Sequence, residues 1–185
     1  MSFILAANRD HDSIDEARKN WEDYRAHLEA LSDRFPPSAF GIATSDWWYQ
    51  PDLPEAPHDS RLIAFRMGDH GAPTWDNHQF SWIEIELQSA YSGRIVLRYP
   101  LVYRYELRMA ESSQGIHGDW RYDEFTLTDD GKLQHTIEWA DGAVWVIEAS
   151  DLEHRHIPES TQESTRATSR VKCNARPAGG RHRSA

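Results

Sequence analysis

Hydrophobic and polar residues alternate along most of the chain after residue 60, and turns interrupt the alternation at intervals. A period of two residues is typical of β-strands that bury one face. Two of the turns contain Asp-Gly, at 130–131 and 141–142, where glycine takes the positive φ that tight hairpins need. The pattern predicts seven or eight antiparallel strands in mostly sequential order, with runs at 61–67, 80–90, 94–109 and 152–157 and three more between 122 and 148.

The region before these strands follows a helical period instead. Apolar residues recur every three or four positions, which predicts one amphipathic helix over about 13–34. Ser13 with Glu16 forms a capping-box pattern, and Pro36 with the proline after it ends the helix. Such a stripe also suits a dimer seam, but docking on the protein's own sheet is more common and is what we expect.

Together these elements predict an α+β fold, in which the N-terminal helix packs on a curved, mostly antiparallel meander sheet or open barrel of seven or eight strands. Residues 1–158 suit a single domain that can bury a core. The proline-rich stretch 36–60 is expected to be an extended loop, and Pro100 predicts a bulge or bend. Residues 159–185 are rich in Ser, Thr, Arg and Gly, which predicts a disordered basic tail.

The loop length of each hairpin follows from the requirement that buried residues share one face of the sheet. This requirement predicts three-residue loops at 91–93 and 129–131, and a two-residue loop at 141–142. The predicted cross-strand partners are Leu87 with Leu97, Phe125 with His135, and Trp139 with Val144.

These registers bring a few ionisable residues together. They make Glu148 the cross-strand neighbour of His135, with Asp123 diagonal to it on the same face. A histidine between two carboxylates can act as a general base that an acid orients, so Asp123, His135 and Glu148 are candidate catalytic residues. The alternative is a structural hydrogen bond at the rim of the sheet.

Metal binding is a second chemical alternative. His154 and His156 alternate along one predicted strand, so both imidazoles lie on one face, a spacing that metal sites use. With His135 they form a candidate ligand set, but the chain has no HExxH, paired CxxC or EF-hand pattern. We therefore expect no cofactor or metal in the favoured interpretation.

Charge is distributed unevenly along the chain. The net charge is −10 at pH 7, but residues 1–158 hold 14 Lys and Arg against 28 Asp and Glu, a net charge of −14. Such a domain repels phosphate backbones, so we expect no nucleic-acid binding through the folded part and favour a basic protein partner. Cys173 is the only cysteine, and no run approaches the roughly 20 apolar residues of a membrane helix, so we expect a soluble, cytoplasmic protein without membrane contact.

Aromatic residues beside acidic ones suggest where such a partner binds. Exposed Trp and Tyr next to carboxylates are typical of a patch that recognises a basic protein. The alternative is that these rings cover the second face of the sheet. The candidate binding residues are Trp47, Trp48, Tyr49, Trp82, Glu84 and Glu86.

Two segments carry a resemblance: H58-D-S-R-L before a strand, and the late Asp-Glu, His, Gly and Ile pattern of 122–157. With these segments the chain resembles a loose group of small uncharacterised bacterial proteins, and some similar small domains are associated with toxin–immunity loci. The resemblance covers about residues 1–158 and implies binding rather than catalysis.

The favoured interpretation is therefore a non-catalytic, cytoplasmic protein-interaction module of immunity type. It would use an acidic, aromatic surface on a basic partner. Two alternatives stay open. One is a metal-dependent or acid–base enzyme centred on the His/carboxylate cluster, and the other is a small-molecule binding barrel with the same polar groups at its mouth.

Overall fold

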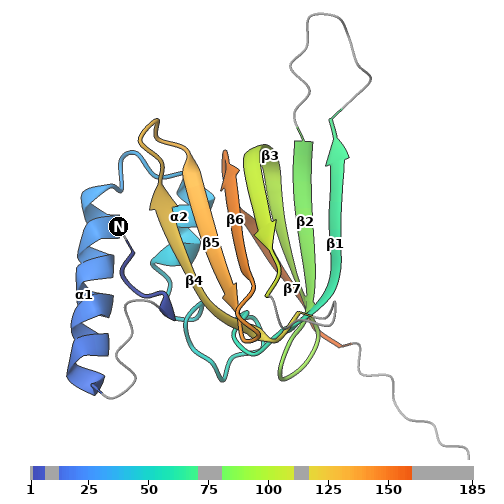
Figure 1. The fold of residues 1–185 in the computed structure, drawn as a ribbon, viewed down its shortest axis with the longest axis horizontal. Coiled ribbons are helices and arrows are strands. Elements are labelled where there is room, and N and C mark those ends of the chain that lie inside the picture. The colour runs from blue at the N-terminus through green and yellow to red at the C-terminus, as the bar shows by residue number, and fades with distance from the viewer. Residues whose placement is uncertain (1, 7–12, 71–80, 111–116, 160–185) are drawn as a thin grey trace, which may run out of the picture.

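The computed structural model describes residues 2–6, 13–70, 81–110 and 117–159, in which the chain forms two helices and one seven-stranded antiparallel sheet (Figure 1). The predicted α+β class is confirmed, and the sheet is open rather than closed into a barrel. All but the first residue of the predicted basic tail lies outside the described residues. The helices are α1 (Ile14–Ala30) and α2 (Pro37–Ala43), and the strands are β1 (Arg61–Asp69), β2 (Ser81–Gln88), β3 (Arg94–Arg108), β4 (Trp120–Leu127), β5 (Leu133–Trp139), β6 (Val144–Ala149) and β7 (Glu153–Ile157).

The strand order is β1-β2-β3-β6-β5-β4, and β7 pairs with the first part of β3. Strand β3 can serve three neighbours because it bends near Pro100, where its registers with β2 and with β6 both shift. Figure 1 shows β3 folding over at the top of the sheet. The bend predicted at Pro100 is thus confirmed, and beyond it β3 pairs with β6.

The bend turns the two halves of the sheet toward each other, and the core lies between them. Tyr99 from β3 reaches His135 on β5, and the ring of Phe65 on β1 packs edge-on against Trp145 on β6 with centroids 5.4 Å apart. The odd-numbered residues of β5 and β6 form the buried layer, as predicted for β5 but not for β6. The sheet therefore covers both sides of its own core.

Helix α1 begins at its predicted cap, where Ser13 Oγ accepts a hydrogen bond from the N–H of Glu16 at 3.2 Å. The helix lies beside β4 in Figure 1, and it docks on the protein's own sheet through the buried residues Tyr24 and Leu28. It ends at Ala30, earlier than predicted, because the chain then forms turns. Neither described helix is long and apolar enough to cross a membrane.

Helix α2 differs from the extended loop that the prolines predict. Pro37 occupies the first turn of α2, where a residue without an N–H group costs nothing. Asp151, which follows β6, accepts hydrogen bonds from the N–H groups of Ser38 and Ala39 at 3.3 and 2.8 Å. Helix α2 packs against both β4 and β7.

Two of the three hairpins keep the predicted buried face. The β4–β5 hairpin has the predicted three-residue loop, and Phe125 faces His135. The β2–β3 hairpin is displaced by two residues, so Leu87 faces Ile95 rather than Leu97. A shift of two residues leaves every side chain on its own face, because the side-chain period of a strand is two.

The prediction for the β5–β6 hairpin was wrong, because its loop has three residues rather than two. Trp139 N–H donates to the carbonyl of Ala143 at 3.0 Å, and Gly142 takes a φ of 90° in between. The residue that pairs with Trp139 across the hairpin is therefore Ala143 and not Val144. This loop keeps the apolar odd-numbered residues of β6 in the core, and it moves Glu148 to the outer face.

Candidate functional site

A buried polar chain crosses the core between the two halves of the sheet. Tyr99 Oη on β3 lies 2.6 Å from His135 Nδ1 on β5, and His135 Nε2 lies 3.1 Å from Asp123 Oδ2 on β4. The side chain of His135 is fully buried, and Asp123 is 5% exposed. The sequence predicted that His135 and Asp123 share a face, and the structure brings them into contact.

Two indole groups complete the environment of Asp123. Trp48 Nε1 donates to Asp123 Oδ2 at 2.8 Å, and Trp120 Nε1 donates to Asp123 Oδ1 at 3.1 Å. The ring of Phe125 stacks on His135 with centroids 4.1 Å apart. Both carboxylate oxygens therefore have neutral N–H donors, which is what a buried carboxylate needs.

This arrangement orders protons but leaves no free base. Burial raises the pKa of Tyr99 well above its ordinary value, and the charge of Asp123 adds to this effect. The Tyr99 hydroxyl therefore keeps its proton beside His135 Nδ1, and the carboxylate of Asp123 accepts from the Nε2–H of His135. Both ring nitrogens are occupied and away from solvent, so the geometry indicates a structural network.

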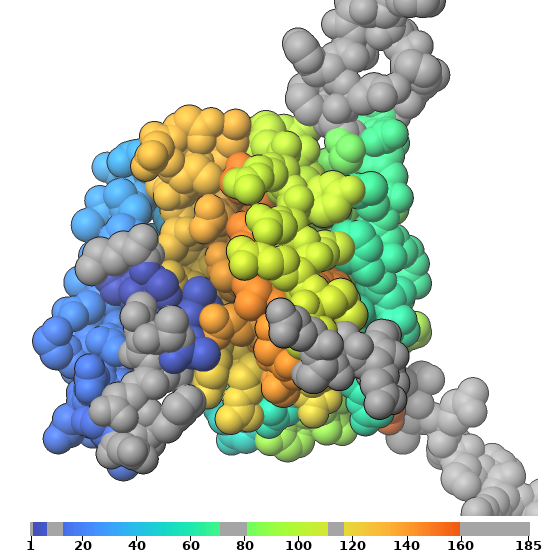
Figure 2. All heavy atoms as spheres, in the orientation of Figure 1, coloured from blue at the N-terminus to red at the C-terminus, as the bar shows by residue number. Residues whose placement is uncertain are grey.

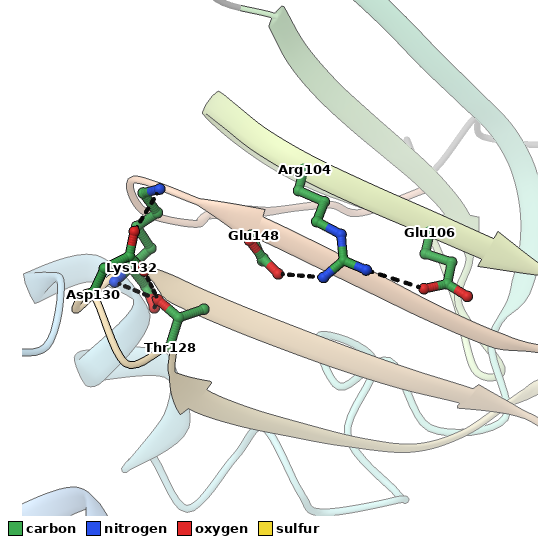
Figure 3. Close-up of polar contacts among 6 residues, drawn as sticks. All are labelled: Arg104, Glu106, Thr128, Asp130, Lys132 and Glu148. Atoms are coloured by element: carbon green, nitrogen blue, oxygen red, sulfur yellow. Dashed lines mark hydrogen bonds and ion pairs between the residues drawn. The ribbon is translucent and has the colours of Figure 1, made fainter.

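Glu148, the third candidate catalytic residue, does not join the cluster. It faces Gln134 on the outer side of the sheet, whereas His135 faces Ile147. Figure 3 shows Glu148 bonded to Arg104, with Oε1 3.0 Å from Nη1. The prediction that Glu148 adjoins His135 was wrong because the β5–β6 loop holds one more residue than the sequence indicated.

The histidines of β7 occupy separate hydrogen bonds. His154 Nε2 bonds to the carbonyl of Glu55 at 3.0 Å, and His156 Nε2 bonds to the carbonyl of Ser92 at 3.0 Å. Burial lowers the pKa of His154, which favours its neutral form. Within the described ranges no three His, Cys, Asp or Glu side chains gather as metal ligands would, so His135, His154 and His156 do not form the alternative metal site.

The predicted acidic, aromatic surface does not form a single patch. Trp48 is 1% exposed and belongs to the core, so the prediction that it is exposed was wrong. Trp47, beside it, is half-buried against His154. Trp48 is buried because its indole N–H has a partner in the core, namely Asp123.

The acidic part of that surface is neutralised. Glu86 is 7% exposed and lies between Arg66 and Arg94, at 2.7 and 2.8 Å. Glu84 also contacts Arg66, at 3.1 Å. Trp82 lies under a guanidinium group, that of Arg98, 5.5 Å from its ring centroid. These residues form a charge-paired outer face and not an open acidic surface.

A cleft of about 480 Å³ lies between α1, the segment 46–58 and the start of β4. Its walls are largely aromatic, and the buried carboxylate of Asp123 belongs to its lining. Of the predicted binding residues, it contains Trp48 and Tyr49. The aromatic lining residues are Trp21, Trp48, Tyr49, Trp120 and Tyr122, and the polar ones are Asn20, Asp46, Gln50, His58, Arg121 and Asp123.

The rings on the α1 side of the cleft contact one another. Trp21 packs edge-on against Tyr49 with centroids 4.5 Å apart, and Tyr49 packs edge-on against Tyr24 at 6.4 Å. Burial raises the pKa of Tyr49, and the nearby Tyr24 and Asp123 raise it further. The rings on the α1 side of the cleft therefore form a neutral, π-rich wall. Sequence reasoning missed Trp21 because its helical stripe predicts only a core-facing position.

His58 and Asp59 hold the opposite wall of the cleft. Asp59 has a φ of 58°, the only positive φ of a non-glycine residue in the described part of the chain. Its N–H donates to the carbonyl of Trp120 at 2.8 Å, which joins the segment before β1 to the start of β4. His58 Nδ1 lies 3.2 Å from Asp59 Oδ2. The His-Asp pair quoted for the resemblance thus shapes the cleft wall.

No protein-family model, curated protein or solved structure matches this chain. The resemblance seen in the sequence stays a prediction, and function has to be inferred from the geometry of the residues themselves.

Proposed function

We propose that this protein is a non-catalytic interaction module that receives a basic side chain of a protein partner in the cleft between α1, the segment 46–58 and β4. The observation that carries the proposal is the cleft itself, whose walls are aromatic and whose lining includes the carboxylates of Asp46 and Asp123. Aromatic faces attract ammonium and guanidinium groups, and the attraction grows as water is removed.

Charge on the whole domain supports the same class of partner. Residues 1–158 carry a net charge of −14, which attracts a basic partner over distance. Asp46 is well exposed at the cleft mouth, where its Oδ1 lies 3.5 Å from Arg25 Nη1. A pair that long and exposed is weak, so Asp46 can exchange Arg25 for an incoming cation at little cost. An immunity-type role, which the resemblance implies, is the form of this proposal in which the partner is a toxin.

A binding role fits the polar chain better than an acid–base role does. His135 has both nitrogens occupied and no exposed surface. A general base needs a nitrogen within hydrogen-bond reach of its substrate. The chain from Tyr99 to Asp123 instead holds Trp48 and Trp120 in fixed positions, and both rings line the cleft.

A small organic cation is a second candidate for the occupant, because the cleft volume lies in the range of small-molecule sites. The two candidates share their chemistry and differ in the size of the molecule that carries the charge. A free amine with an aromatic body would bind the isolated protein as tightly as a peptide does, whereas a protein partner adds contacts around the mouth.

The test is affinity capture from the source cell with the wild type and three variants. Trp21→Ala removes a wall of the cleft, and Asp46→Asn removes the charge at its mouth. Asp129→Asn is the matched control, because it removes the same charge from an exposed turn outside the cleft. We expect a basic partner whose affinity falls about tenfold or more with Trp21→Ala and less with Asp46→Asn, and which Asp129→Asn retains.

Salt and peptide titrations complete the test. Binding should weaken as ionic strength rises, because exposed charges are screened. Peptides from the partner should lose affinity when their Lys and Arg are replaced by Gln. A partner that binds the Trp21→Ala protein as tightly as the wild type, or that has no basic segment, would refute the proposal.

A further inference from the structure

Apolar side chains on the inner face of the sheet are not all covered, and one of the exposed ones lies on β1. Met67 faces Ile83, and Tyr105 faces Ile147, so both lie on the inner, buried side of the sheet. Their partners are fully buried, yet Met67 is 48% and Tyr105 43% exposed. Ile63, at the register shift of β1 and without a cross-strand partner on β2, is exposed to a similar degree. Apolar side chains that face inward and still contact water lack a covering element.

The backbone of β1 also has an open edge, the one that faces away from β2. Ser89 N–H donates to the carbonyl of Gly93 where the β2–β3 hairpin closes. The backbone groups of the odd-numbered residues of β2 therefore bond to β3. By alternation, the even-numbered residues of β2 bond to β1, through Ala64, Arg66 and Gly68. The N–H and C=O groups of the residues between them, Phe65 and Met67, point away from the sheet.

No strand of the described residues pairs with this outer side of β1, apart from the contact of the segment before it with Trp120. In Figure 2 the blue-green atoms of β1 form the right-hand margin of the molecule, beside the yellow-green atoms of β3. An open edge with exposed apolar side chains is a template for another strand.

We propose that β1 pairs with β1 of a second copy of this chain, antiparallel across a two-fold axis at Phe65. This arrangement places the Arg61 end of each strand beside the Asp69 end of the other copy, and the exposed Ile63 near Met67. The strand is thus complementary to itself in charge at its ends and in apolar character between them, as an isologous interface requires. The second copy also covers the exposed, inward-facing side chain of Met67.

The end charges are available for such pairing. Arg61 has a side chain that is 76% exposed, and its contact with Asp119 is long, at 4.0 Å. Asp69 accepts a hydrogen bond from Ser81 Oγ at 2.8 Å and keeps a second carboxylate oxygen for a partner. The register shift between Leu62 and Ala64 limits the flat part of the edge to the residues that follow it. The central hydrogen bonds therefore come from Phe65 and Met67.

Sedimentation and light scattering test the proposal by measuring mass against concentration. The wild type should double its mass by about 100 µM. Met67→Pro should stay monomeric, because proline removes an outward N–H without removing a bond to β2. Tyr91→Ser is the control, because it removes an exposed aromatic residue at the β2–β3 turn and should leave the dimer intact.

Charge reversal sharpens the register. Arg61→Asp and Asp69→Arg should each weaken the dimer about tenfold or more, and the double variant should restore it, because the opposed charges are complementary again. A wild type that stays monomeric, or single variants that the double variant does not rescue, would overturn the proposal.

Amide exchange on the wild type tests the β1–β1 pairing without any variant. The amides of Phe65 and Met67 should become protected as concentration rises, whereas those of Arg66 and Gly68 should be protected at every concentration. Equal exchange at Phe65 and Met67 in dilute and concentrated protein would contradict the pairing, even if the chain dimerises through another surface.

Discussion

The two outer strands of the sheet, β4 and β1, differ in how their edges are finished. At β4, Tyr24 of α1 covers the edge: its hydroxyl accepts from the N–H of Phe125 at 2.8 Å and donates to the carbonyl of Phe125 at 3.1 Å. At β1, no side chain of the described residues plays this part, and Arg66 only adds ion pairs on the outer face. The backbone edge of β4 is covered by a buried side chain, whereas that of β1 has only charged side chains nearby and is open to pairing with another strand.

The difference shows what a helix outside the sheet contributes. A tyrosine can satisfy both backbone groups of one strand residue only when a rigid element holds its hydroxyl at the edge, and α1 does so at β4. The N-terminal segment adds to this side, because Glu124 accepts from the N–H groups of Phe3 and Ile4 at 2.6 and 2.8 Å. We therefore expect stability to be concentrated on the β4 side.

The largest expected effect follows from Asp123→Ala. This change leaves the N–H groups of Trp48, Trp120 and His135 without an acceptor in the core, and should lower the free energy of unfolding by about 3–5 kcal/mol. The control on the β1 side is Asp69→Ala, which should cost about 0.5 kcal/mol or less in dilute protein. Urea denaturation measures the free energy of unfolding of both variants, and equal losses would show that the β4 side is no more important for stability than the β1 side.

Tyr24→Phe should have the next largest effect. It removes the hydroxyl that satisfies both backbone groups of Phe125 and should cost about 1–3 kcal/mol, because those groups stay buried. Amide exchange should quicken at Phe125 and remain unchanged on β1. Tyr91→Phe removes an exposed hydroxyl and serves as the control. Unaltered exchange at Phe125 would show that the edge of β4 does not depend on Tyr24.

Glu86→Gln should have the smallest effect, and one that depends on pH. The hydrogen bond from Arg66 lowers the pKa of Glu86, so the folded state binds this proton less readily than the unfolded chain. Its stabilising contribution is therefore present above the pKa of the unfolded chain and is lost as pH falls through the lowered pKa of the folded protein.

Unfolding curves from neutral to acid pH measure this contribution. Wild type should be more stable than Glu86→Gln at neutral pH, and the free energies of unfolding of the two proteins should become equal in acid. Glu29→Gln, on the exposed face of α1, is the control with the same charge change. A constant difference between wild type and Glu86→Gln across this range would show that the ion pairs of Arg66 do not stabilise β1.

Sequence reasoning recovered the elements that local patterns determine. The cap at Ser13, the bend at Pro100 and the face shared by Asp123 and His135 all depend on residues close in the chain or on simple alternation. The loop at Gly142 shows the limit, because Asp-Gly suits hairpin loops of two and of three residues. One residue of loop length then decides on which face Glu148 lies.

The cleft was beyond such reasoning for a different reason. Its walls come from α1, the segment 46–58 and β4, and no local pattern sets the distance between them. Pro37 can end one helix or begin the next, and the sequence alone favoured the first. The partner of Trp48 lies 75 residues away, at Asp123. Contacts of this kind depend on the complete fold.

The bend in β3 has a consequence for how the molecule assembles. Its first part receives β7, which is the last strand of the described chain, and its second part receives β6. Neither half of the sheet is complete until residues synthesised some 50 positions later have arrived. On the ribosome, β1, β2 and β3 therefore emerge with their inner face bare, and a chaperone that shields apolar surface has its task during that interval.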